Sequence, residues 1–96
     1  MLVQLQKVNI VNEGYKRGVS FDKIYVNPAH VISIRDYSGV NQFLLQEGHH
    51  DHASQKYSLI KMNNIKGIEE VIVLGTSREI FESFNSKTES KELLNG

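Results

Sequence analysis

Short runs of β-branched and aromatic residues, each closed by glycine, asparagine, aspartate or proline, limit most strongly how this chain can fold. Such punctuation is typical of short β-strands joined by turns. The longest apolar run, residues 71–74, has the length of a strand and falls far short of a membrane span. The pattern therefore predicts a mainly antiparallel sheet. The runs that we expect to be strands are Leu2–Val11, Val19–Val26, Val31–Tyr37, Asn41–Glu47, Tyr57–Met62 and Glu70–Leu74.

Polar segments separate these runs and predict the connections. Residues 12–18 and 48–55 are expected to be loops, and residues 63–67 a turn. Asn27–His30 also predicts a turn, because Pro28 is suited to its second position.

The first run changes its apolar parity. Val3 and Leu5 share one face of a strand, whereas Val8 and Ile10 share the other. A strand that keeps one buried face changes parity at a bulge or a bend. We therefore expect a kink near residues 6–7.

One helix is predicted near the C-terminus. Thr76 is a natural N-cap, and Glu79 follows three residues later, as in a capping box. Apolar residues then recur at helical spacing. We expect a helix over about residues 77–85 that packs both Phe81 and Phe84 on the sheet.

Length and composition define the class of the chain. Its 96 residues suit one domain. We expect this β-rich domain to cover residues 1–85 and a polar tail to follow over residues 86–96. A second short helix is the alternative for the tail. The absence of cysteine excludes disulfides, cysteine-type zinc sites, iron–sulfur clusters and a thiol nucleophile. The predicted class is α+β: a small twisted antiparallel sheet or a partly open barrel with one C-terminal helix.

Charge is balanced overall but uneven along the chain. The 11 basic and 11 acidic side chains cancel, which removes the simplest argument for binding nucleic acid or an anionic membrane. Residues 1–68 nevertheless carry a net charge of +3 and residues 69–96 a net charge of −3. The first residues lack the basic and long apolar regions of a signal peptide, so we expect a cytoplasmic protein without an anchor.

The segment His49-His50-Asp51-His52 gathers three imidazoles and a carboxylate. These groups suit zinc, nickel or copper. In an extended loop, His50 and His52 point to one side and His49 to the other, so a second segment or subunit would have to complete a tetrahedral site. A solvated loop is the favoured interpretation. A weak or functional metal site, and a pH-sensitive or anion-binding loop, are the alternatives.

A second candidate surface begins at Tyr15, Lys16, Arg17 and Gly18, which combine an aromatic ring, two cations and a glycine. Single-strand nucleic-acid binders use such residues. Further aromatic and cationic residues, including Arg35, could extend this surface. The neutral balance and the short basic run argue against avid phosphate binding, so we do not expect nucleic acid as a partner.

Catalytic motifs are missing from the chain. There is no Gly-x-Ser-x-Gly elbow and no standard phosphate-binding glycine loop. Gly75–Ser77 stands where a strand meets a helix and could bind an anion, but a structural cap is the favoured interpretation. Glu69 and Glu70 are adjacent and more suited to an exposed turn than to a catalytic pair.

The segment Ile24–Ile34, with its Asn-Pro-Ala-His turn, resembles a segment of the FlbD-like family. In that family a strand leads into an Asn-Pro-Asp-His turn and a Val-x-x-Ile motif. Many small phage and bacterial proteins contain the same segment. Tyr57–Met62 is similar to that family's hairpin strand, and Val71–Phe81 to its strand, cap and helix. The resemblance covers residues 19–84, and this chain adds Ser38–Lys56 and a C-terminal tail. It implies a small sheet with one helix, self-association and no enzymatic activity or catalytic residue.

Self-association is also expected from the residues themselves. Exposed edge strands need covering, and the apolar Phe43–Leu45 lies inside a polar stretch. A homo-oligomer that pairs edges, or packs Phe43–Leu45 between subunits, would satisfy both needs.

The predicted function is a small non-enzymatic binding or regulatory protein, of a kind that phages encode, acting through a protein partner as a homo-oligomer. The alternative is an oligomeric binder or sequestering protein for a small anionic or nucleotide-like ligand. A second alternative is a metal-binding protein that uses the His49–His52 loop. No cofactor, catalytic residue or assigned metal ligand is expected. The candidate ligand-binding residues are Tyr15, Lys16, Arg17, Arg35, His49, His50 and His52.

Overall fold

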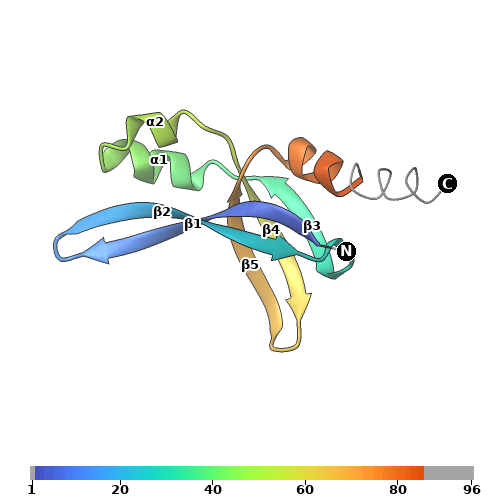
Figure 1. The fold of residues 1–96 in the computed structure, drawn as a ribbon. Helices are drawn as coiled ribbons and strands as arrows, with labels where there is room; N and C mark the ends of the chain where they lie inside the picture. Colours follow the sequence, from blue (N-terminus) through green and yellow to red (C-terminus); the bar gives the residue numbers. More distant parts are fainter. Residues whose placement is uncertain (1, 86–96) are drawn as a thin grey trace.

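The computed structural model describes residues 2–85, in which an antiparallel sheet carries helices on both faces (Figure 1). The predicted tail, residues 86–96, lies outside the described residues. The strands are β1 (Val3–Glu13), β2 (Lys16–Val26), β3 (Val31–Asp36), β4 (Tyr57–Asn64) and β5 (Gly67–Leu74). The helices are the 3-10 turn η1 (Pro28–His30), α1 (Gly39–Gln46), α2 (His50–Ala53) and a C-terminal helix over residues 77–85.

The sheet has the strand order β2-β1-β5-β4-β3, and its neighbouring strands are antiparallel. Strands β2 and β3 are its two edges, and the sheet does not close into a barrel. The predicted α+β class is therefore confirmed, with an open sheet as the architecture.

Strands β1 and β2 form a long hairpin, and α1 and α2 lie along its outer half (Figure 1). Pairing is continuous from Val3 opposite Val26 to Glu13 opposite Lys16. Only residues 14–15 are left for the turn, so the predicted loop over residues 12–18 is wrong. Gly14 has φ +67°, the conformation that a tight hairpin turn requires at its first central position. Asn12, Lys16 and Arg17 are exposed residues of these strands.

The pairing of β1 with β2 contains no bulge near residues 6–7. The parity change has another cause. Val3 and Leu5 face one hydrophobic cluster, and Val8 faces a second cluster on the opposite side of the sheet. Because both faces are covered, one regular strand can bury both parities.

A bulge occurs instead in edge strand β3. Val31 pairs with Met62 and Ser33 with Lys61, which leaves Ile32 as the extra residue. The bulge brings Val31 and Ile34 to the same hydrophobic cluster. The side chain of Ile32 remains 52% exposed.

Residues 41–47, predicted as a strand, are for the most part helix α1. Val40 and Leu44 are spaced one helical turn apart and are buried, with Leu44 fully inaccessible. The strand prediction used the short run 43–45 alone, whereas the apolar positions starting at Val40 follow the helical period. The loop predicted over residues 48–55 likewise contains the short helix α2.

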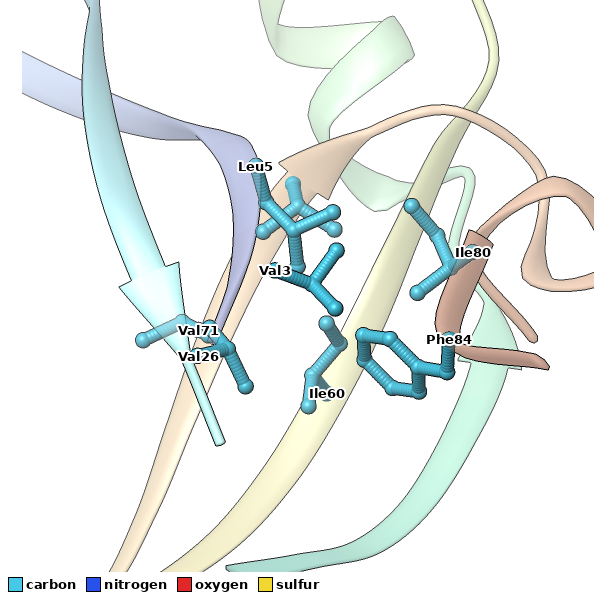
Figure 2. Packing of buried hydrophobic residues seen from close by; sticks show 8 residues of the cluster. Val3, Leu5, Val26, Ile60, Val71, Ile80 and Phe84 are labelled. Carbon is cyan, nitrogen blue, oxygen red and sulfur yellow. The ribbon is translucent and has the colours of Figure 1, made fainter. Parts of the chain in front are cut away.

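The larger hydrophobic cluster lies between the sheet and the C-terminal helix (Figure 2). Glu79 N–H donates to Thr76 Oγ1 at 3.1 Å, so the predicted N-cap is confirmed. Phe84 is buried as expected, but Phe81 is 58% exposed and the prediction for it is wrong. The buried members of this cluster are Val3, Leu5, Val26, Ile60, Val71, Val73, Ile80 and Phe84.

The second cluster lies under α1 and α2 on the opposite face. Its buried residues are Val8, Val40, Leu44 and Tyr57. Alternation along β5 separates the two clusters, because residues 71 and 73 enter the first and residues 72 and 74 pack against the second.

Candidate functional site

The predicted ligand-binding residues lie in three separate places. Tyr15, Lys16 and Arg17 are at the tip of the β1–β2 hairpin, and Tyr15 is 98% exposed. Arg35 lies on β3, whereas the hairpin tip adjoins β2, which is the opposite edge of the sheet. The histidines lie in and just before α2. Arg17 nevertheless approaches the helices, because it lies beside Glu47, two residues before His49.

Arg17 already has partners within the chain. Its Nε lies 3.8 Å from Glu47 Oε1, and its guanidinium carbon is 5.3 Å from the centroid of the Phe43 ring. Both partners belong to α1 or its C-cap. Arg17 therefore connects the hairpin to the helical layer, and a ligand would have to compete for it.

Arg35 is engaged in a similar way. Its guanidinium carbon lies 5.5 Å from the centroid of the Tyr37 ring, two residues further along the chain. The contact is local and leaves Arg35 exposed at the sheet edge.

The histidines differ from one another in their surroundings. The rings of His49 and His52 lie 6.4 Å apart, and His52 packs against Phe21 with ring centroids 4.9 Å apart. Tyr57 Oη donates to the backbone oxygen of His52 at 2.7 Å, while His50 is exposed. Of the three histidines, His52 therefore connects α2 to the sheet, through Phe21 and Tyr57.

Residues 2–85 contain no group of three His, Cys, Asp or Glu side chains arranged to hold a metal ion. His30, on η1, is exposed and lies apart from α2. Within the same residues, the buried Nε2 of His49 has no hydrogen-bond partner. Burying such a group without a partner costs stability.

A junction pocket of about 520 Å³ lies where the end of β3 approaches the starts of α1, β4 and the C-terminal helix. Sequence reasoning missed it, because its residues come from distant segments. The hydrogen bond from the Ser77 backbone, with a further one from its side chain, lowers the pKa of Asp36, and Lys56 adds to the effect. The pocket is lined by Asp36, Tyr37, Ser38, Asn41, Lys56, Tyr57 and Thr76.

A groove of about 540 Å³ runs between edge strand β3 and the C-terminal helix; we call it the Phe81 groove. Ile32 on the strand side is 52% exposed, and Phe81 on the helix side is 58% exposed. Phe84, which also lines the groove, belongs to the main hydrophobic cluster. The groove is therefore a continuation of the core to the surface. Apolar surfaces of this kind often mark protein interaction sites.

The helical spacing contained a signal for this groove. Ile80 and Phe84 are four residues apart and share the buried stripe. Phe81 lies three residues after Arg78 and Glu82 lies four after it, so these side chains share one stripe. Treating both phenylalanines as core residues overlooked this difference.

No helix within residues 2–85 is both long enough and apolar enough to cross a membrane. Comparisons of the chain with models of protein families, with curated proteins and with solved structures found no match.

Proposed function

We propose that the protein is a small non-enzymatic binding protein that acts through a protein partner, and that it self-associates through the Phe81 groove. The observation that carries the proposal is the exposure of Phe81 and Ile32 on the two sides of one groove. Burial of a phenylalanine or isoleucine side chain is worth about 1.5–3 kcal/mol. A protein surface that covers both residues would recover this free energy.

The other surface considered for self-association is less suitable. Leu44, in the middle of Phe43–Leu45, is fully buried inside its own chain, and Phe43 lies under Arg17. Only Leu45, at 57% exposure, offers a large apolar surface there. One isolated apolar side chain is ordinary on a protein surface.

The alternative of a small anionic ligand has less support. The residues expected to bind it are divided between the hairpin tip, β3 and α2, and Arg17 is already paired with Glu47. A regulatory role and a phage origin remain proposals that follow from the predicted class of protein.

Sedimentation velocity of the full chain over micromolar concentrations tests the proposal. We expect the wild type to self-associate and Phe81→Ser to be monomeric. Leu45→Ser is the matched control, because Leu45 and Phe81 are 57% and 58% exposed; it should behave as the wild type. A wild-type chain that stays monomeric throughout, or a Leu45→Ser variant that alone becomes monomeric, would contradict the use of this groove.

A further inference from the structure

The exposed side of the C-terminal helix has a regular pattern. Arg78, Phe81, Glu82 and Asn85 follow the spacing i, i+3, i+4, i+7 and form one exposed stripe. The opposite stripe contains Ile80 and Phe84, which are 4% and 7% exposed. The helix is therefore fixed to its own sheet on one side and presents an apolar ring between charges on the other.

The charges of the stripe are self-complementary. Arg78 Nε lies 3.1 Å from Glu82 Oε1, and the two side chains are 87% and 59% exposed. Suppose that two copies of this helix pack antiparallel and that a twofold axis crosses them at the height of position 80. Position 78 of each copy then faces position 82 of the other. Each arginine then meets a glutamate, twice in one interface. Phe81 of both copies lies near the centre of this contact.

Pairing of two β3 edge strands is a less suitable way for two copies of the chain to associate. β3 is only 6 residues long and is interrupted by the bulge at Ile32. Short edges and bulges are features that hinder strand addition. The bulged Ile32 and the rest of the Phe81 groove remain available to enlarge a helix-mediated contact. A stable interface buries about 800 Å² on each partner, so the groove has to contribute beside the helix.

We propose that two copies of the chain pair through their C-terminal helices, antiparallel about a twofold axis, with reciprocal Arg78–Glu82 contacts around Phe81. This inference rests on the proposed function, because it specifies how the Phe81 groove self-associates. The partner is a second copy of the chain, and the contact is the same on both copies.

Charge reversal of the full chain tests this arrangement. Arg78→Glu alone places two glutamates opposite each other, and Glu82→Arg alone places two arginines opposite each other. Each single variant should weaken dimerisation by about tenfold or more. An equimolar mixture of the two should form a heterodimer, because every facing pair is then of opposite charge. The double variant Arg78→Glu/Glu82→Arg should dimerise like the wild type.

Native mass spectrometry can measure the mixture, because the two variants differ in mass. Far-ultraviolet circular dichroism of each variant checks that the fold is kept, as expected for exposed positions. Random mixing of the variants, with no preference for the heterodimer, overturns the antiparallel helix arrangement. If Phe81→Ser still abolishes dimers in that case, the proposed function stands and only this arrangement fails. A monomeric wild-type chain, by contrast, contradicts the proposed self-association itself.

Discussion

The backbone N–H of Ser77 donates a 2.8 Å hydrogen bond to Asp36 Oδ1. This contact joins the end of β3 to the first residue of the C-terminal helix, two segments that lie far apart in the sequence. It therefore fixes the position of the helix beside β3, where the two elements form the Phe81 groove.

This contact predicts a pH dependence of stability. The hydrogen bonds from Ser77 lower the pKa of Asp36 in the folded state below its ordinary value. The resulting stabilisation is present above the unfolded pKa, about 4, and is lost as the pH falls through the folded pKa. Asp36→Asn should therefore be less stable than the wild type at neutral pH, and this difference should shrink under acidic conditions. Urea unfolding at neutral and at acidic pH measures the difference in the free energy of unfolding between the two proteins.

Asp51→Asn is the control for this experiment, because it removes the same charge at an exposed position on α2. We expect it to be close to wild-type stability at neutral pH. An Asp36→Asn variant whose deficit is the same at neutral and acidic pH would refute the role assigned to the carboxylate.

Helix α1 predicts a large contrast between two adjacent leucines. Leu44 is 0% exposed, whereas Leu45 is 57% exposed. Leu44→Ala should lower the free energy of unfolding by about 2–5 kcal/mol, since it opens a cavity in the second cluster. Leu45→Ala should change it by about 0.5 kcal/mol or less. Chemical denaturation of both variants measures the difference, and equal effects would contradict the burial of Leu44 beside an exposed Leu45.

Asn41 is expected to hold α1 and α2 together. Its Nδ2 donates to the backbone oxygens of Ala53 at 2.8 Å and Gln55 at 2.7 Å. Asn41→Ala should destabilise the protein by about 1–3 kcal/mol, because two acceptors lose their donor. Asn41→Asp should also be destabilising, since a carboxylate cannot donate. The neighbouring Gln42→Ala is the control; if it proves as costly as Asn41→Ala, the two hydrogen bonds are not the cause.

The unpaired nitrogen of His49 predicts a stabilising substitution. Nε2 is buried and has no hydrogen-bond partner within residues 2–85. Replacement of His49 by Leu removes this buried polar group and should raise the free energy of unfolding by about 1 kcal/mol. His50→Leu, at an exposed position, should have little effect. Thermal unfolding compares the two variants, and a destabilised His49→Leu variant would indicate that the imidazole has a function in the fold.

The sequence by itself determined the features that depend on neighbouring residues. Short runs of β-branched and aromatic residues located β2, β3, β4 and β5, because such runs and the turn residues that bound them are neighbours in the sequence. Pro28 and the Asn27 side chain, which accepts a 3.0 Å hydrogen bond from Ala29 N–H, produce the predicted turn. Thr76 caps the predicted helix for the same local reason.

The tertiary structure decided which surfaces are covered and by what. Val8 can be buried opposite the face of Leu5 only because α1 covers that side, with Leu44 packed in the same cluster. Val40 and Leu44 give the helical period only two buried positions, so packing on the sheet decided between strand and helix at residues 39–46. Phe81 faces outward because Ile80 and Phe84 already fill the space against the sheet. The candidate groove could not be predicted from local pattern, because its two sides come from segments that only the folded chain brings together.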